Sequence, residues 1–596
     1  MHRLRALVVA LVLLAPAPLC AETTLDWRSW SATEFASAKA QKKLVLLDLK
    51  AVWCHWCHVM DEVTYRDPNV VKLLNDHFIV IRADQDANPD LSSRYGDWGW
   101  PATILFAGDG SELAKIRGYR DPEQMTSILN AFIKDPTPGP SVEIALPVIP
   151  AQEAFLSKTQ RARLLSNFSE AYDKTYGGWG AAQKFIHVDS MDYALSEAAK
   201  GDESARQIVR KTLDAALSLM DKEWGGLFQY SDQPDWQSPH YEKIMWYQAQ
   251  GLRQYSQAFA LLGDQKHRDA ARQIVTYLTT HLKAEEGAFY TSQDADVSSS
   301  MHGKEFYALN DNERRKIGEP RVDKNIYSRE NGWAISGLAA YADATGDSDV
   351  LAQAVAAANW TVRNRSLDNG GFSHGDRDRA GPYLGDTLAM GEAFIALYAS
   401  TGDRSWLERA IRAGDFIAAK FKANIGFSTA VSPELDTGAF LVNTLNVEEQ
   451  GQVARFFNLL GRYSGEGRFS DMARHAMRYL ASDHVMTMPR LLAGVLVSDE
   501  QLATEPVHVT IVGHRDDAKA MRLHDAARLI AETYRRIDWW DTREGPMINP
   551  DVQYPELDEA AAFACSAQLC SRPAFSAAEL TEVLAEMAKL RPARQN

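Results

Sequence analysis

The chain has 596 residues, of which 45% are hydrophobic and 24% are charged, so it can fill real cores and is not a disordered protein. With 64 Lys and Arg against 79 Asp and Glu, the net charge of −15 argues against nucleic acid or an anionic membrane as partner, because binding to phosphate depends on an excess of cations. Five cysteines are too few for a disulfide-framed scaffold, so each needs its own explanation.

The first 21 residues have the layout of a secretory signal peptide. Arg3 and Arg5 precede the apolar run ALVVALVLLA, and the small residue Ala21 stands at the expected cleavage position. The apolar run is shorter than the roughly 20 residues that a membrane span needs; an uncleaved anchor is the alternative. We therefore expect a periplasmic or secreted protein with no stable membrane insertion after signal cleavage. Its four remaining cysteines form two close pairs.

Residues 25–138 alternate strand-like and helix-like stretches, which favours an α/β layer fold. The predicted strands are Leu44–Leu49, Phe78–Asp84 and Ala102–Gly108. Prolines then crowd the stretch up to Pro150, so we assign residues 139–150 to a linker.

Residues 151–503 are helical and repeat two kinds of turn. One is Gly-Asp, in which Gly can end a helix in the left-handed conformation and Asp can cap the next one. The other is a glycine-aromatic turn. The Gly-Asp turns begin at Gly201, Gly263, Gly346 and Gly402, and the glycine-aromatic turns are at Gly177, Gly225, Glu286, Gly370 and Gly426. Two alternating turns between about twelve helices predict an (α/α)6 toroid, with an open helical solenoid as the alternative.

Residues 504–596 return to a small α/β segment. Val507–Gly513 and Ala560–Cys565 are predicted strands, and Asp516–Arg535 and Ala577–Leu590 are predicted helices. The predicted fold is therefore multidomain, with an α/β domain, an all-α toroid and a C-terminal α/β segment.

The strongest local signal is AVWCHWCHVM, in which Cys54 and Cys57 stand just after a strand and at a helix start. This spacing lets two sulfurs meet within one turn, and the helix N-terminus stabilises a thiolate on Cys54, with Cys57 as the resolving thiol. We expect the two sulfurs to be neighbours at an exposed tip. A zinc site using these cysteines with His55 or His58 is the alternative, but no second pair lies nearby in sequence and we predict no metal.

The segment LVLLDLKAVWCHWC resembles the strand and active-site turn of the thioredoxin superfamily. The resemblance implies that Asp48 is the buried acid that relays a proton to or from Cys57, and that Pro101 is the cis-proline beside the disulfide. His55 stands between the cysteines, where a cationic imidazole should favour the Cys54 thiolate and make the disulfide more oxidising; a neutral surface histidine is the alternative.

Over nearly all of its length after the signal, the chain is similar to the spermatogenesis-associated thioredoxin-like family, in which a Cys-His-Trp-Cys-His domain is joined to a toroid of the glycan-epimerase kind. The resemblance rests on CHWCHVM, GGWGAAQKF, GGLFQYSDQPDWQSPHYEKIMWYQAQ, FYTSQDAD and the late Cys565/Cys570 segment. Trp246-Tyr247-Gln248 stand where that family usually has an acidic residue.

Polar and aromatic residues near the toroid's turns suggest a ligand pocket. Aromatic rings stack on apolar sugar faces, and carboxylates accept hydroxyl protons or act as acids and bases. Alternatively, Glu242 and Lys243 cap and pair while the aromatics fill the central cavity of the ring, and a peptide-binding cleft for redox clients is also open. The candidate pocket residues are His240, Glu242, Trp179, Tyr230, Trp236, Asp294 and Asp296.

Cys565 and Cys570 predict a second disulfide. It is either structural or an internal relay with Cys54/Cys57, and the relay requires the C-terminal segment to approach the N-terminal domain.

Together these features predict an exported thiol–disulfide oxidoreductase that needs no cofactor. Its partners would be protein thiol or disulfide clients or a redox partner, with a glycan as a further candidate ligand of the toroid. A carbohydrate-active toroid, epimerase- or hydrolase-like, with a regulatory redox domain is one alternative. A non-enzymatic client-binding protein is another.

Overall fold

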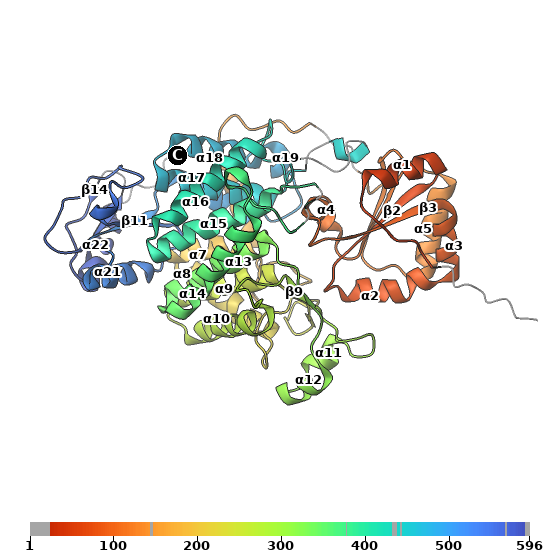
Figure 1. Cartoon of the computed structure of the whole chain (residues 1–596), viewed down its shortest axis with the longest axis horizontal. Coiled ribbons are helices and arrows are strands. Elements are labelled where there is room, and N and C mark those ends of the chain that lie inside the picture. The colour runs from red at the N-terminus through yellow and green to blue at the C-terminus, as the bar shows by residue number, and fades with distance from the viewer. Residues whose placement is uncertain are drawn as a thin grey trace, which may run out of the picture.

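The computed structural model describes residues 24–142, 147–376, 378, 380–431, 438–441, 444–566 and 569–590. The predicted signal peptide lies outside the described residues, as does part of the predicted linker. Three domains lie in a row, with the N-terminal domain and the C-terminal domain at opposite ends of a helical toroid (Figure 1). Among the described residues, no helix has both the length and the apolar character that crossing a bilayer requires.

The N-terminal domain is a five-stranded sheet in the order β1-β3-β2-β4-β5. Strands β1, β3 and β2 run parallel to one another, and β4 runs antiparallel to both of its neighbours, β2 and β5. All three predicted strands are present, whereas β1 and β5 were not predicted. The strands are β1 (Arg28–Ser29), β2 (Leu44–Lys50), β3 (Phe78–Asp84), β4 (Ala102–Phe106) and β5 (Glu112–Arg117). The helices are α1 (Ala32–Gln41), α2 (His55–Glu62), α3 (Pro68–His77), α4 (Pro89–Tyr95) and α5 (Pro122–Lys134).

The central domain is a closed ring of six inner helices, each backed by an outer helix. Each inner helix packs against the next one along the chain, and α20 packs against α7, so the ring closes and is not an open solenoid. The inner helices are α7 (Val188–Ala199), α9 (Met245–Leu262), α13 (Ser328–Thr345), α15 (Leu384–Thr401), α17 (Val447–Ser464) and α20 (Ala493–Ala503). The outer helices are α6 (Lys158–Glu170), α8 (Glu203–Ala216), α10 (Gln265–Tyr277), α14 (Ser348–Arg365), α16 (Arg404–Lys420) and α18 (Gly467–Leu480).

Both repeated turns do what their residues predict. Gly263, Gly346 and Gly402 end their helices in the left-handed conformation, and the following Asp caps the next helix in two of these turns. Asp264 instead pairs with Arg210, Nε to Oδ2 at 2.8 Å. The glycine-aromatic turns each close an isolated β-bridge. These bridges are Tyr172 with Trp179, Met220 with Leu227, Lys283 with Phe289, Ser366 with Phe372, and Lys422 with Phe427.

Short strands extend from one end of the ring toward the N-terminal domain (Figure 1). In particular, β8 pairs antiparallel with β9, and this brings the start of α9 beside the segment that follows β9. The short elements are β6 (Tyr230–Ser231), β7 (Pro239–His240), β8 (Lys243–Ile244), β9 (Ser292–Gln293), β10 (Val322–Asp323), α11 (Gly303–Tyr307), α12 (Asp311–Ile317) and α19 (Asp483–Met486).

The toroid is anchored in the core of the N-terminal domain by one of its own loops. Phe440, in the short turn Gly438–Leu441, is 4% exposed and packs among buried aromatic residues of the N-terminal domain. Its ring centroid lies 5.1 Å from that of Trp30 and 5.9 Å from that of Phe106. A Cβ on Gly438 would lie 2.1 Å from the Gly110 backbone, so only glycine fits this contact.

The C-terminal domain is a four-stranded sheet in the order β12-β11-β13-β14, covered by α21 and α22. The predicted helix Asp516–Arg535 is too long: α21 ends at Arg528, and RRIDWW forms a strand that pairs parallel with β11. The helix prediction for Ala577–Leu590 is confirmed. The elements are β11 (Val507–Val512), α21 (Ala518–Arg528), β12 (Arg535–Trp540), β13 (Ala561–Ser566), β14 (Leu569–Cys570) and α22 (Ala577–Leu590).

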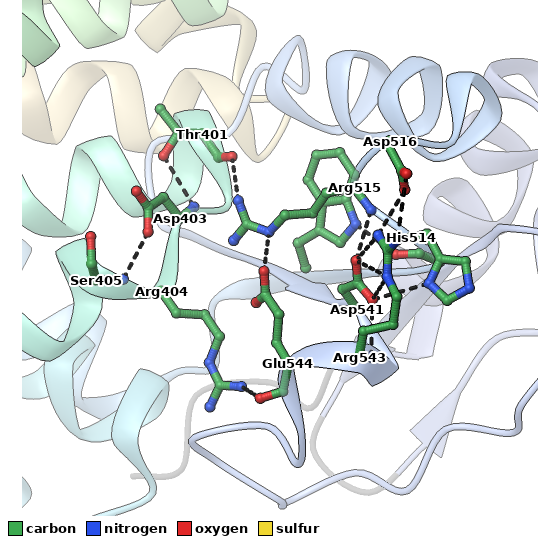
Figure 2. A network of polar contacts seen from close by, with 12 residues as sticks. Thr401, Asp403, Arg404, Ser405, His514, Arg515, Asp516, Asp541, Arg543 and Glu544 are labelled. Atoms are coloured by element: carbon green, nitrogen blue, oxygen red, sulfur yellow. Dashed lines mark hydrogen bonds and ion pairs between the residues drawn. The ribbon is translucent and has the colours of Figure 1, made fainter.

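Charged residues fix the C-terminal domain to the turn between α15 and α16 (Figure 2). Arg515 donates from Nη1 to the carbonyl of Thr401 at 3.5 Å, and its Nε lies 2.7 Å from Glu544 Oε1. Arg404 of the toroid donates to the carbonyl of Glu544 at 2.8 Å. Beside them, the hydrogen bonds from Arg543 hold the pKa of Asp541 far below its usual value.

Candidate redox site at the domain junction

Cys54 and Cys57 form a disulfide at the start of α2, immediately after the loop that follows β2. Cys54 is the N-cap of the helix, and its Sγ accepts a hydrogen bond from the backbone N–H of Cys57 at 3.1 Å. The positive end of the helix dipole therefore faces Cys54, which stabilises a thiolate there once the disulfide is reduced. The predicted neighbourhood of the two sulfurs is confirmed.

The predicted exposure of this pair is wrong. Cys54 is 3% exposed and Cys57 is 2% exposed, because the toroid lies over the tip of the N-terminal domain. Ile244, in β8 of the toroid, packs against the same apolar cluster as the disulfide, together with Trp100. The sequence motif places the sulfurs correctly within their own domain but contains no information about what docks on them.

Asp48 is buried in β2, as expected for an acid in this strand, and it is 2% exposed. Burial raises its pKa, while the guanidinium of Arg82 opposes that shift across a 2.9 Å contact between Nε and Oδ2. The two residues are opposite each other in the parallel register of β2 and β3. Asp48 is therefore one half of an ion pair, and its role as a proton relay to Cys57 stays a prediction.

The peptide bond between Trp100 and Pro101 is cis, as the resemblance implies. Trp100 packs against the cluster of Trp53, Cys54 and Cys57, so the proline loop lies beside the disulfide. The indole N–H of Trp53 donates to Asp86 Oδ2 at 2.8 Å, and the backbone carbonyl of Asp86 lies 2.6 Å from Nε2 of His374 in the toroid. The loops around the disulfide are thus tied to the toroid by side chains of both domains.

Two histidines of the CHWCH motif face two aspartates of the toroid. His55 Nδ1 lies 2.5 Å from Asp296 Oδ2, and His58 Nε2 lies 3.6 Å from Asp294 Oδ2. His302 approaches the same oxygen of Asp296, with its Nδ1 at 3.4 Å. Asp294 and Asp296 were predicted as pocket residues of the toroid; the structure places them at the redox motif instead.

This contact changes the charge state of the motif. The hydrogen bond with Asp296 raises the pKa of His55, so the imidazole stays protonated to higher pH. Burial lowers the pKa of His58 and raises the pKa of Asp294 to about 7. Pairing with a carboxylate would reduce the effect of a cationic His55 on a Cys54 thiolate, and the predicted role of His55 stays a prediction. These side chains also form two sets of potential metal ligands that share Asp296: His55, Asp296 and His302, and His58, Asp294 and Asp296.

His240 and Glu242 lie in the same region, next to β7 and β8. The ring of His240 stacks on Tyr230 with centroids 4.2 Å apart, and its Nε2 lies 2.7 Å from Asp232 Oδ2. Glu242 is 3% exposed, and its Oε2 has no hydrogen-bond partner among the described residues. Five predicted pocket residues thus gather in this region: Tyr230, His240, Glu242, Asp294 and Asp296. Glu242 is close enough to influence the pKa values of both His55 and Asp294.

Trp179 and Trp236 do not belong to a pocket. Both are at most 2% exposed within the main apolar core of the toroid, and their indole N–H groups donate to the backbone carbonyls of Phe168 and Tyr176. Fully packed indoles with satisfied N–H groups are structural, so the prediction that these two bind a ligand is wrong.

The toroid instead has a cavity of about 300 Å³ on its axis, lined by side chains from all six inner helices. Its polar and aromatic lining includes Asp192, Trp246, Arg253, Trp333, Glu392 and Arg455, and Thr533, Tyr534 and Arg535 of the C-terminal domain also line it. None of these was predicted as a site residue. The available signal was a charged side chain in the middle of an otherwise apolar or small-residue inner helix, as at Glu392 in LGDTLAMGEAFIALYAST.

Cys565 and Cys570 form the predicted second disulfide, between β13 and β14. Cys565 is 5% exposed and its Sγ lies 3.5 Å from the hydroxyl of Tyr554, whereas Cys570 is exposed on the edge strand. This disulfide and Cys54–Cys57 lie on opposite sides of the toroid, as the positions of β14 and α2 show (Figure 1). Direct exchange between the two pairs, as in the relay hypothesis, would therefore require a different domain arrangement.

Comparisons with known proteins agree with this geometry. Residues 19–130 match the model of a family described as "Protein of unknown function, DUF255". The N-terminal domain is thioredoxin-like. Thiol:disulfide interchange protein DsbD of Escherichia coli strain K12 is 33% identical over 100 residues, which are 16% of this chain and 18% of that protein.

A longer match runs into the toroid. Spermatogenesis-associated protein 20 of Mus musculus is 29% identical over 306 residues, which are 46% of this chain and 39% of that protein. The match thus spans about two fifths of the length of this relative. Among solved structures, cellobiose 2-epimerase from Bacillus thermoamylovorans B4167 is similar with a TM-score of 0.42 and 12% identity, covering 54% of this chain and 86% of that chain.

Proposed function

We propose that the protein is an exported thiol–disulfide oxidoreductase whose reactive pair is Cys54 and Cys57. The observation that supports this most is the arrangement of that pair: a disulfide at the N-terminus of α2, a cis-proline loop beside it and a buried acid in the preceding strand. Export is supported by the signal-like residues 1–21 and by two cysteine pairs, which suit an oxidising compartment.

The chemistry is disulfide exchange. In the reduced protein, the Cys54 thiolate attacks a client disulfide, which forms a bond between Cys54 and one client sulfur and releases the other client sulfur as a thiolate that takes up a proton. Cys57 then loses its proton and attacks Cys54, which closes the internal disulfide and releases the second client sulfur. The same steps run in reverse when the client is the reductant, so the potential of the pair sets the direction.

Access to the pair requires the toroid to move away from α2. Both cysteines are almost fully buried and pack with Ile244 of the toroid, so the docked arrangement protects the disulfide from any client larger than a small molecule. We therefore propose that exchange with a protein client takes place when this contact opens, and that the docked form is a resting state.

The test is the equilibrium potential of the pair in the full chain, measured in glutathione buffers by differential alkylation and mass spectrometry. We expect a value between about −270 and −120 mV, within the range of redox-active pairs of this superfamily. Insulin reduction by the wild type should be lost in Cys54→Ser and kept in Cys570→Ser. Equal activity of Cys54→Ser and the wild type would overturn the proposal.

A second candidate function is carbohydrate binding in the axial cavity, which does not depend on the redox pair. Trp246 and Trp333 lie on its wall with ring centroids 4.6 Å apart, and indole faces suit the apolar faces of sugars. Burial raises the pKa of Glu392 to about 7, a value that suits an acid or base at neutral pH.

Binding of mono- and disaccharides by calorimetry should weaken in Trp333→Ala but not in Trp360→Ala, a half-buried tryptophan of α14 that does not line the cavity. Equal binding by both variants, or none by the wild type, would remove this candidate.

A further inference from the structure

Two histidines from the N-terminal domain and one from the toroid converge on a pair of toroid aspartates, which suggests more than an ion-pair contact. Imidazole nitrogens and carboxylate oxygens are ligands of Zn²⁺ and other first-row divalent ions. Within each of the two overlapping ligand sets, all donor atoms lie within 4.8 Å of one another. The ligands of each set come from both domains, so the site exists only when the two domains are docked.

We propose that His58, Asp294 and Asp296 bind a divalent first-row transition metal at the junction of the thioredoxin-like domain and the toroid. The contact between His58 Nε2 and Asp294 Oδ2 is 3.6 Å, which is too long for a hydrogen bond. Two ligands of a tetrahedral Zn²⁺, each about 2.0 to 2.1 Å from the ion, lie about 3.4 Å apart. The spacing of the two atoms therefore fits an ion between them better than a direct bond.

The two ligand sets share Asp296, whose Oδ2 is in direct contact with His55 Nδ1 at 2.5 Å, so they differ in Asp294 and His58 against His55 and His302. By contrast, Asp294 is 4% exposed and has no arginine or lysine partner among the described residues. In the proposed site, three ligands come from His58, Asp294 and Asp296. The fourth position would be filled by His55 or His302, which both lie near Asp296, or by water.

Backbone N–H groups orient the proposed carboxylate ligands. The backbone N–H of Gly303 donates to Asp296 Oδ1 at 2.9 Å, and the N–H of Asp296 donates to Asp294 Oδ1 at 3.1 Å, which leaves the Oδ2 atoms of both residues directed at the histidines. The buried Oε2 of Glu242 lies 3.7 Å from His240 Nδ1 and adds a third carboxylate close enough to influence Asp294. A bound cation would compensate these negative charges, whose burial is otherwise costly.

The site has a mechanical consequence because its ligands come from two domains. An ion there links α2 to the segment after β9 and stabilises the docked arrangement over the open one by mass action. It would thus hold the disulfide in its protected form. The proposal itself needs no redox turnover, since the cysteines remain in their disulfide while the ion is bound.

The test is titration of the full chain with ZnCl₂, and separately with MnCl₂ and CoCl₂, by calorimetry, followed by metal analysis after desalting. Free thiols are first blocked with iodoacetamide, so that cysteine cannot supply ligands. We expect one ion per chain and binding weakened by more than about tenfold in His58→Gln and Asp294→Asn. The matched controls His484→Gln and Asp471→Asn change exposed residues outside both ligand sets and should bind as the wild type does.

A second measurement keeps the test decisive if a variant folds poorly. Bound Zn²⁺ should slow the reduction of Cys54–Cys57 by a phosphine in the wild type, and this protection should be absent in His58→Gln while the circular dichroism of the two proteins agrees. No metal bound by the wild type, or equal binding by the wild type and both junction variants, would overturn the proposal. Neither result would bear on thiol exchange by Cys54, which is measured without metal.

Discussion

The two disulfides of this protein show how differently a cysteine pair can be placed. The Cys54–Cys57 disulfide lies at the start of a helix and is covered by a second domain. The Cys565–Cys570 disulfide joins two strands, and its Cys570 is exposed on the edge of a sheet. Judged by the motif alone, the first pair is the reactive one, yet it is the less accessible of the two. Local sequence thus sets the chemistry of a thiol, and the docking of domains sets when that chemistry can take place.

The largest expected effect separates the two pairs by function. Cys54→Ser should lower the rate of disulfide exchange with insulin by more than about 100-fold, because the attacking thiolate is lost. Cys570→Ser should keep most of the wild-type rate, since its sulfur lies on the other side of the toroid. A comparable loss in both variants would show that the two disulfides act together in exchange.

The next effect tests whether docking protects the first pair. Phe440→Ala removes an aromatic ring from the core of the N-terminal domain and should lower the free energy of unfolding by about 3 kcal/mol. The same change should speed the reduction of Cys54–Cys57 without affecting Cys565–Cys570, as followed by timed alkylation and mass spectrometry. The control is Phe155→Ala, whose side chain is 38% exposed. Unchanged reduction of Cys54–Cys57 would mean that the loop does not control access.

A smaller effect concerns the wild type alone. At limiting reductant, Cys565–Cys570 should be reduced first, by about tenfold in rate, because reduction of the covered pair requires a local opening. The measurement is the order in which the four cysteines become alkylated. Simultaneous reduction of both pairs would indicate that the junction opens faster than the reductant attacks.

The smallest effect is a pH dependence of opposite sign at the two ends of the toroid. Asp541 has a lowered pKa in the folded protein, so its stabilising contribution is present above the unfolded value of about 4 and is lost as the pH falls below it. Asp84, at the N-terminal junction, has its pKa raised by burial to about 6, so protonation stabilises that region and the benefit is lost as the pH rises from about 4 through 6. Amide hydrogen exchange should therefore become faster at the N-terminal junction as the pH rises from 5 to 7, beyond the intrinsic effect of pH, whereas the protection around Asp541 should not change. Slower exchange at the N-terminal junction with rising pH would contradict the assignment.

Much of the fold follows from the sequence, because its determinants are local. The strands around Asp48 are mostly apolar runs, and the glycines of the repeated turns adopt the positive φ that other residues rarely take. Where local signals conflict, prediction fails: the helix expected to reach Arg535 ends at Arg528, because the following aromatic and β-branched residues pair with β11.

The site was predictable only in part, for a related reason. Cys54, Cys57 and Pro101 lie within one domain and follow from a motif, whereas the contact of His55 with Asp296 joins residues 241 positions apart. Trp179 and Trp236 were predicted to face a ligand because glycine turns carry them, but the packing of neighbouring helices encloses them. No periodicity along one segment reports which of its faces another domain will cover.

The contact between α20 and α7 has a consequence for biosynthesis. The ring closes only when its first inner helix, α7, contacts its last inner helix, α20, which ends at Ala503. Until that residue has been made, the nascent ring has an open seam of apolar side chains. A chaperone that shields this seam during synthesis or translocation would therefore matter more for this domain than for the sheets on either side of it.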